Sequence, residues 1–239
     1  MLKITGFELR KIIGRHGSFY GVIGFSLFVA VLVTIFGTNQ DAETWNNALG
    51  IPMVFSATIL GALAGSYDAA QGTMRYLVLT GEPRWKLVAT RVPALFITIA
   101  LVMLPASILA VICMSGNHQS GQVILDIVLG TYLGSVTWAI VSMAVGTLLR
   151  SNGAGIAVAL VLFFVGSLLT QLVRDQISQH VGDYLLPNVS NVVSTLGHTF
   201  GADNGPTITI GLASALFATV LWLIAIVGLA VLRVQRDEY

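Results

Sequence analysis

The charged stretch SYDAAQGTMRYLVLTGEPRWKLVATR, residues Ser66–Arg91, separates two segments that are apolar enough to cross a membrane. It holds three arginines, one lysine, one aspartate and one glutamate, although only 10% of the 239 residues are charged and 55% are hydrophobic. A soluble domain carries about 25% charged residues. The composition therefore predicts a membrane protein in which this stretch is a connection outside the lipid.

Uncharged runs long enough to span a bilayer, which takes about 20 residues, occur six times. We therefore expect an all-α polytopic membrane protein with six transmembrane helices, forming a single transmembrane domain over residues 1–239. The spans are expected at about 18–37, 50–67, 88–114, 125–149, 152–173 and 207–232.

Basic residues predict the orientation, because lysine and arginine accumulate in short cytoplasmic segments. With the N-terminus inside, eleven of the twelve basic residues lie on the cytoplasmic side, and only Arg174 lies outside. Both termini are then expected to be cytoplasmic. The chain is expected in a cell membrane, plasma or inner, as a multi-pass protein.

The segment before the first span, residues 2–15, alternates apolar residues with charges. We expect an amphipathic interfacial helix along the inner membrane surface, with its basic side chains facing lipid headgroups. An ordinary positive flank that only fixes the topology is the alternative. The charged residues singled out in this segment are Glu8, Arg10, Lys11 and Arg15.

The longest outer connection covers residues 174–206. Its part YLLPNVSNVVSTL is apolar enough to dip into the outer leaflet. Irregular backbone at that depth is tolerated only where it is buried in protein or lines a cavity. The sequence therefore predicts a re-entrant or interfacial hairpin before the last span, with a plain surface loop as the alternative.

Several kinds of chemistry leave no trace in this sequence. No span carries an ionisable residue near its middle, which argues against a proton-driven transporter. There is no serine-hydrolase elbow, no HExxH zinc pair and no phosphate-binding loop ending in Gly-Lys-Ser/Thr. We expect no catalytic site, no metal site, no cofactor bound by this chain and no nucleic-acid partner. Cys113 lies in an apolar run and is interpreted as a small hydrophobe.

The fourth span carries aromatic and hydroxyl side chains that form a candidate substrate path for an amphipathic or lipid-like compound, although ordinary helix packing explains them equally well. These residues are Tyr132, Ser135, Thr137, Trp138 and Ser142. Glycines at four-residue spacing also let helices approach closely. The two such pairs are Gly61 with Gly65 and Gly130 with Gly134.

The charged connection itself, residues 68–87, is expected to form a helix-turn-helix elbow. The sequence TGEP ends the first helix at Gly81, and Pro83 suits the first position of the next helix, where its missing N–H costs nothing. Trp85 and the neighbouring cations give this second helix an apolar and a basic side. That is the shape of a docking element, and a positive-inside loop anchored by a tryptophan is the simpler alternative.

These residues resemble those of the permease subunits of type 2 ABC exporters, the class that includes drug, bacitracin and lantibiotic-immunity exporters. In that family an E-L-x-K…R segment precedes the first span. A G-T-x-R-x-L-L motif, a turn, an arginine and a basic residue seven positions on lie between spans two and three. This chain has ELRKIIGR at residues 8–15, followed by Gly72, Thr73, Arg75, Leu77, Arg84 and Arg91. It departs from the family at Gly81, where a proline is usual, and at Arg91, where a lysine is usual.

The resemblance implies a non-enzymatic permease subunit in a bacterial cell membrane that exports an amphipathic or hydrophobic compound by alternating access. ATP and Mg²⁺ would be used by a separate ABC ATPase subunit, present in two copies. A second permease copy, identical or related, would complete the pore, and membrane lipid would surround it. The elbow would be the coupling helix, with Arg75 and Arg84 as anchors. The implied ATPase-coupling residues are Gly72, Thr73, Arg75, Gly81, Pro83, Arg84, Lys86 and Arg91.

Three rivals stay open at this point. A channel or uncoupled facilitator would need a polar stripe on a central helix. An immunity or sensor protein would bind an antimicrobial without coupling to ATP. A lipid-acting membrane enzyme would bring several titratable groups to one membrane depth. Candidates for such an outer cluster are Asp126, Arg174, Asp175 and His180.

Overall fold

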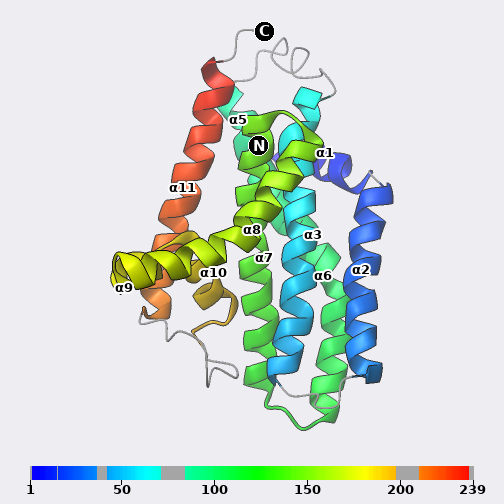
Figure 1. Cartoon of the computed structure of the whole chain (residues 1–239). Coiled ribbons are helices and arrows are strands. Elements are labelled where there is room, and N and C mark those ends of the chain that lie inside the picture. Colours follow the sequence, from blue (N-terminus) through cyan, green and yellow to red (C-terminus); the bar gives the residue numbers. More distant parts are fainter. Residues whose placement is uncertain (1, 15, 37–41, 71–83, 198–209, 237–239) are drawn as a thin grey trace.

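The computed structural model describes residues 2–14, 16–36, 42–70, 84–197 and 210–236 (Figure 1). Within these ranges the chain forms helices and no strands. Six of the helices are long and apolar enough to cross a membrane. The expected all-α polytopic fold is therefore confirmed. The helices long enough to span are α2 (His16–Phe36), α3 (Ala42–Ala70), α6 (Arg91–Gly116), α7 (Gly121–Leu149), α8 (Asn152–Gln176) and α11 (Leu212–Arg236).

Four shorter helices accompany the spans in the described part of the chain. They are α1 (Leu2–Ile13), α5 (Arg84–Ala89), α9 (Gln179–Asp183) and α10 (Leu186–Ser194). The largest difference from the expected boundaries is at α3, which begins at Ala42 rather than near residue 50. Glu43 lies in its first turn, where the partial positive charge of a helix N-terminus favours a carboxylate. An acidic residue therefore belongs to this helix instead of bounding it.

Helices α3 and α7 run side by side in the same direction at the centre of the bundle (Figure 1). Their backbones are in close contact, because a Cβ atom added to Gly61 or Gly65 would overlap the carbonyl oxygen of Ala139 or Met143. The close approach expected from this glycine pair is confirmed. The second pair, Gly130 and Gly134, instead accommodates Ser194 of α10.

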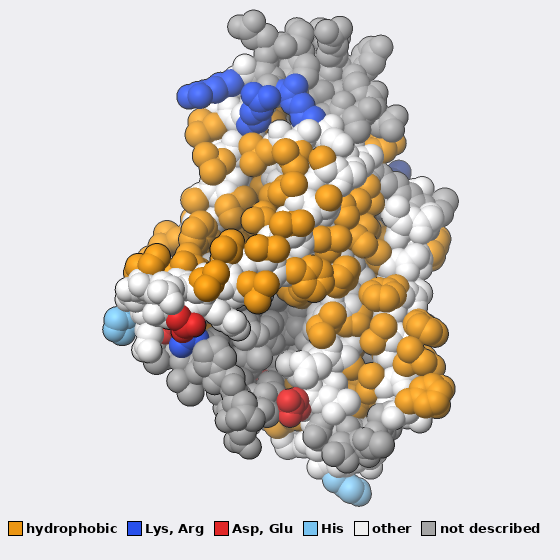
Figure 2. Space-filling model, in the orientation of Figure 1, with side chains coloured by type: hydrophobic (Ala, Val, Ile, Leu, Met, Phe, Trp, Pro, Cys, Tyr) orange, Lys and Arg blue, Asp and Glu red, His pale blue; other side chains and the backbone are white. Residues whose placement is uncertain are grey.

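Lysine and arginine side chains gather at one end of the molecule, and apolar side chains cover much of the surface beyond it (Figure 2). This end, where α1, α5 and the C-terminal end of α11 lie, is called the basic end (Figure 1). Many large apolar side chains on the long helices are exposed, for example Phe28 on α2, Leu168 on α8 and Ile224 on α11. An exposed apolar surface of this kind suits contact with lipid tails.

The connection between α8 and α11 folds back against the bundle as a hairpin of α9 and α10. Leu186, at the start of α10, packs against the buried cluster that contains Trp138 of α7, and Leu223 of α11 packs against the same cluster; Trp138 and Leu223 lie near the middle of their helices. The indole nitrogen of Trp222 donates a hydrogen bond of 3.0 Å to the carbonyl oxygen of Tyr184. The described part of the hairpin therefore lies beside the central parts of two long helices, and its re-entrant character stays a prediction.

Candidate functional site

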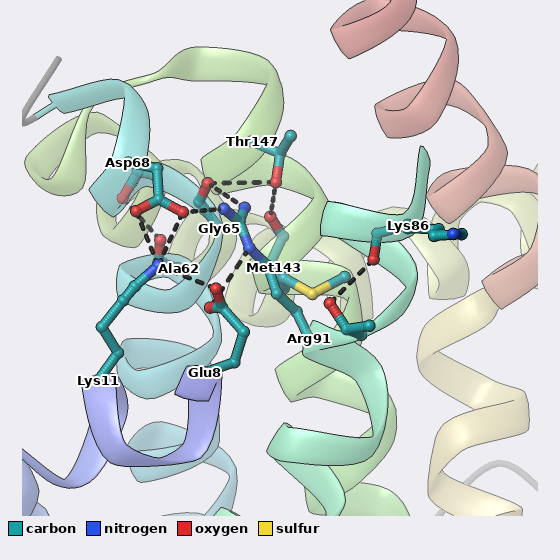
Figure 3. Close-up of polar contacts among 11 residues, drawn as sticks. Glu8, Lys11, Ala62, Gly65, Asp68, Lys86, Arg91, Met143 and Thr147 are labelled. Atoms are coloured by element: carbon teal, nitrogen blue, oxygen red, sulfur yellow. Dashed lines mark hydrogen bonds and ion pairs between the residues drawn. The ribbon is translucent and has the colours of Figure 1, made fainter. Parts of the chain in front are cut away.

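Four charged side chains meet at the basic end, where α3 leads into the charged connection (Figure 3). Glu8 and Lys11 come from α1, Asp68 from the last turn of α3, and Arg91 is the first residue of α6. The Lys11 ammonium lies 2.9 Å from Glu8 Oε1 and 2.8 Å from Asp68 Oδ1. Arg91 donates from Nη2 to Asp68 Oδ2, and its Nε lies 3.8 Å from Glu8 Oε2. Each carboxylate thus contacts both cations.

In this group, called the charge network (Glu8, Lys11, Asp68 and Arg91), three members are buried and Lys11 is partly buried. Arg91 is 0% exposed, Asp68 2% and Glu8 4%. A buried charge is costly unless it is paired and hydrogen-bonded. Asp68 also lies near the C-terminus of its helix and Arg91 at the N-terminus of its own, where the helix dipole disfavours both charges. Mutual pairing, with a formal sum of zero, is therefore what stabilises these charges here.

Hydrogen bonds extend the charge network to two further helices. Arg91 Nη1 donates to the carbonyl oxygen of Gly65 at 3.0 Å, and the Thr147 hydroxyl on α7 donates to the same oxygen at 3.3 Å. The Ser66 hydroxyl donates to Asn152 Oδ1, at the start of α8, over 2.5 Å. The end of α3 is consequently tied to α1, α6, α7 and α8. Its residues Gly65, Ser66 and Asp68 are called the α3 hub.

The other end of the charged connection, helix α5, is anchored as well. Val88 of α5 is fully buried, in the same hydrophobic cluster as Val234 of α11. The Thr90 backbone N–H and hydroxyl both donate to the carbonyl oxygen of Lys86, over 2.9 and 2.8 Å, which joins α5 directly to the start of α6. Both flanks of residues 71–83 are therefore fixed to the long helices.

Comparison with known proteins adds a family. A family model described as "Protein of unknown function (DUF2705)" matches residues 18–239. The chain belongs to the DUF2705 family. No curated protein and no solved structure matches it. What this DUF2705 chain does must therefore be argued from its own residues.

The structure brings together three of the residues predicted for coupling or for the interfacial helix: Glu8, Lys11 and Arg91. It also corrects how one of them acts. Lys11 was expected to face lipid headgroups but turns inward, because Asp68 of α3 lies within 2.8 Å of it. The Arg91 guanidinium is fully buried within the chain, and its role in ATPase coupling stays a prediction. Arg10, by contrast, is exposed, as an interfacial residue should be.

Other predicted coupling residues lie outside the described part of the chain. Arg84 begins α5, but its side chain is among those not described, and Lys86 is half-buried on the same helix. The predicted residues outside the described ranges are Arg15, Gly72, Thr73, Arg75, Gly81 and Pro83.

Sequence reasoning missed the acceptor side of the site. Asp68 was treated only as the end of a span, and Ser66, Thr147 and Asn152 were not singled out. One signal was available, since an acidic residue directly after an apolar run needs a cation nearby. Arg91 occupies the matching position directly before the next apolar run.

The candidate path residues of the fourth span lie in packed surroundings. Ser135 and Trp138 are buried, and the Tyr132 hydroxyl donates to the carbonyl oxygen of Phe96 at 3.0 Å. The hydroxyls of Thr137 and Ser142 donate to carbonyl oxygens of their own helix, at 2.9 and 2.7 Å. Helix packing accounts for these positions, and a substrate path along them stays a prediction.

At the hairpin, Arg174 pairs with a residue that the sequence did not single out. Its Nε lies 3.2 Å from Oδ1 of Asp183, which is fully buried at the end of α9. Asp175 and His180 are exposed. Within the described ranges, no three His, Cys, Asp or Glu residues are grouped so that they could hold a metal ion.

Proposed function

We propose that this chain is the permease subunit of an ATP-driven exporter of the type 2 ABC class. One observation carries the proposal: both flanks of the charged connection are anchored in buried contacts that reach α1, α6, α7, α8 and α11. A force applied at either flank would therefore move whole helices.

The physical argument concerns stiffness. Hydrogen bonds and ion pairs are stronger in the low dielectric of a protein interior than in water, and networks of them rigidify what they join. A surface loop that only fixed topology would need neither a buried four-charge network nor a shared carbonyl acceptor at Gly65. A coupling element needs both, because it must pass on a displacement made by another protein.

The energy source follows from what the spans lack. The charge network lies at the end of the spans, and the middle of each span carries no ionisable residue that could move with a proton gradient. We assign nucleotide hydrolysis to a separate ATPase subunit, in two copies, bound at the basic end. A second permease copy completes the assembly, and the cargo is an amphipathic or hydrophobic compound such as a drug, an antimicrobial peptide or a lipid.

Residue roles divide into two groups. Arg75 and Arg84 are the proposed anchors for the ATPase. Arg91, Asp68 and the α1 pair are positioning residues, which act by holding the connection against the helices. This division separates loss of docking from loss of transmission in an experiment.

Co-purification from native membranes in a mild detergent tests the proposal. An ATPase subunit should accompany the wild-type chain and be lost from the Arg75→Glu/Arg84→Glu variant. The matched control is Arg233→Glu/Arg236→Glu, which makes the same charge change at exposed positions of the same end. If no ATPase co-purifies with the folded wild type, the exporter proposal fails, and an immunity or sensor function becomes the better-supported proposal.

A further inference from the structure

Helix α11 contacts the charged connection at one of its ends and the hairpin along its other half (Figure 1). It runs from Leu212 to Arg236 without a proline or a break. At about 1.5 Å per residue it is about 37 Å long, which is enough to reach across a membrane. These contacts give it a different place in the bundle from α3, whose end is held by the charge network.

At the basic end, α11 packs against α5. Val88 of α5 and Val234 of α11 are 0% and 2% exposed, and both belong to one hydrophobic cluster. Val231, one turn before Val234, packs against the same cluster. A shift of α5 therefore cannot occur without either displacing the end of α11 or opening a gap at these valines.

In its other half, α11 holds the hairpin by two separate contacts. Ala215 and Ala218 form a buried cluster with the valines of α10. Trp222 donates its indole N–H to the carbonyl oxygen of Tyr184, in the turn between α9 and α10. The valines of this cluster are Val189, Val192 and Val193. One face of α11 thus contacts both the turn between α9 and α10 and helix α10 itself.

The neighbouring helix α7 is joined to α11 differently. Its contact with α11 is made by apolar side chains such as Trp138 and Leu223. Its contact with α3 is a close backbone packing at glycines, which fixes those two helices together. The hairpin also lies closely against α7, because a Cβ atom added to Gly130 would overlap the carbonyl oxygen of Ser194. The hairpin is therefore packed between α7 and α11, and a displacement of α11 must either carry it along or open a gap at Ala215 and Ala218.

We propose that α11 is a rigid link that couples the position of α5 at the basic end to the position of the α9–α10 hairpin. The proposal deepens the exporter function, on which it rests for the source of movement. The link itself is a property of this chain alone, so its test needs no ATPase.

The test measures exposure of the hairpin while the far end of α11 is loosened. In a Cys113→Ser background the chain has no cysteine, and Ser190→Cys places a similar-sized probe on α10 at a position only 4% exposed. The labelling rate of this probe by a membrane-impermeant maleimide is measured in intact cells. Val88→Ala/Val234→Ala then shortens the buried side chains that α5 and the end of α11 contribute to their shared hydrophobic cluster.

We expect labelling of the probe to become about three- to tenfold faster in the Val88→Ala/Val234→Ala variant, a coupling of the size found along packed networks. The matched control is Val22→Ala/Val102→Ala, which removes the same atoms from the same hydrophobic cluster on α2 and α6. The control should leave the rate within about twofold of the parent, since small cavities act locally.

An unchanged rate in the Val88→Ala/Val234→Ala variant overturns the link, and so does an equal rise in the control, which would mean general loosening. Size-exclusion chromatography checks folding, and Val88→Ala alone replaces the double variant if that one does not fold. Failure of the exporter function would be seen separately, as absence of an ATPase in the co-purification.

Discussion

The α3 hub and the α9–α10 hairpin are both polar joints at which a long helix meets other elements, yet they are built differently. In the charge network, to which the hub contributes Asp68, two carboxylates and two cations come from three helices, and Lys11 and Asp68 are 57 residues apart in the chain. At the hairpin, one ion pair, Arg174 with Asp183, joins the end of α8 to the short helix that directly follows it.

The difference between these two joints indicates which part of the molecule is the more rigid. A network that joins distant segments closes large loops of chain and holds several helices in one arrangement. A local pair shapes a turn and leaves the turn free to move as a unit. The basic end is therefore expected to move as one body, and the hairpin to be the more readily displaced of the two.

The largest expected effect is at the hub. Arg91→Met leaves two buried carboxylates with a single cation, and removing one partner of a buried ionic group costs about 3–5 kcal/mol. Thermal unfolding in detergent should show a large loss of stability. Arg10→Met, on the exposed side of α1, should change stability by no more than about 0.5 kcal/mol. Equal behaviour of the two variants would remove the distinction between hub and surface.

The next test concerns the close packing that supports the hub. In Gly65→Ala the added methyl would overlap the Met143 carbonyl oxygen, so α3 and α7 must separate. Overpacking of this kind costs about 1–3 kcal/mol. Gly50→Ala, in the same helix, meets nothing within 4 Å and should leave the unfolding temperature unchanged or slightly raised. A tolerated Gly65→Ala would contradict the close approach.

The hairpin pair should matter less than the hub. Asp183→Asn removes the charge that faces the Arg174 guanidinium in this ion pair, and leaving a buried polar group without its partner costs about 1–3 kcal/mol. The exposed neighbour Asp175→Asn is the control. A double-mutant cycle with Arg174→Gln isolates the pairwise energy. If Asp183→Asn costs as much as Arg91→Met, the contrast between the two joints is wrong.

The smallest effect is expected at Thr147. Thr147→Val keeps the shape of the side chain but removes the hydroxyl that bonds to Gly65 of α3 and to Met143 of its own helix. A net loss of about 0.5–1.5 kcal/mol is expected. Thr170→Val on α8 removes a hydroxyl bonded only within its own helix, to Gly166, and should cost less. Denaturant titration compares the two, and a reversed order would show that the Thr147 bond to the hub residue Gly65 does not stabilise the chain.

The six spans could be predicted because each is a continuous apolar run, a property of one segment alone. The glycine pair at Gly61 and Gly65 could be predicted for the same reason, since its spacing places both residues on one face of a helix. Their partners on α7 could not, because parallel packing of α3 and α7 depends on the arrangement of the whole bundle.

The positions of the charge-network side chains could not be predicted from local sequence patterns. The amphipathic pattern of α1 predicted that Lys11 faces headgroups, since the pattern contains no information about Asp68. The burial of Arg91 was equally hidden, because a cation at the start of a span normally faces the membrane surface. Pairing energy between distant segments decided both positions.

The exposed turn around His118, between α6 and α7, separates the charge network from the helix that packs on α3 through its glycines. All four members of the charge network precede this turn, and the glycine-packed partner helix α7, together with α8 and the hairpin, follows it. A chain split at this turn would yield two membrane fragments, the first with its ion pairs already complete. Their reassembly would rely on the fit of α7 against α3 and α6. Charge pairing therefore lies within one half of the molecule, and the halves are joined by helix packing and by the hydrogen bonds of Thr147 to Gly65 and of Ser66 to Asn152.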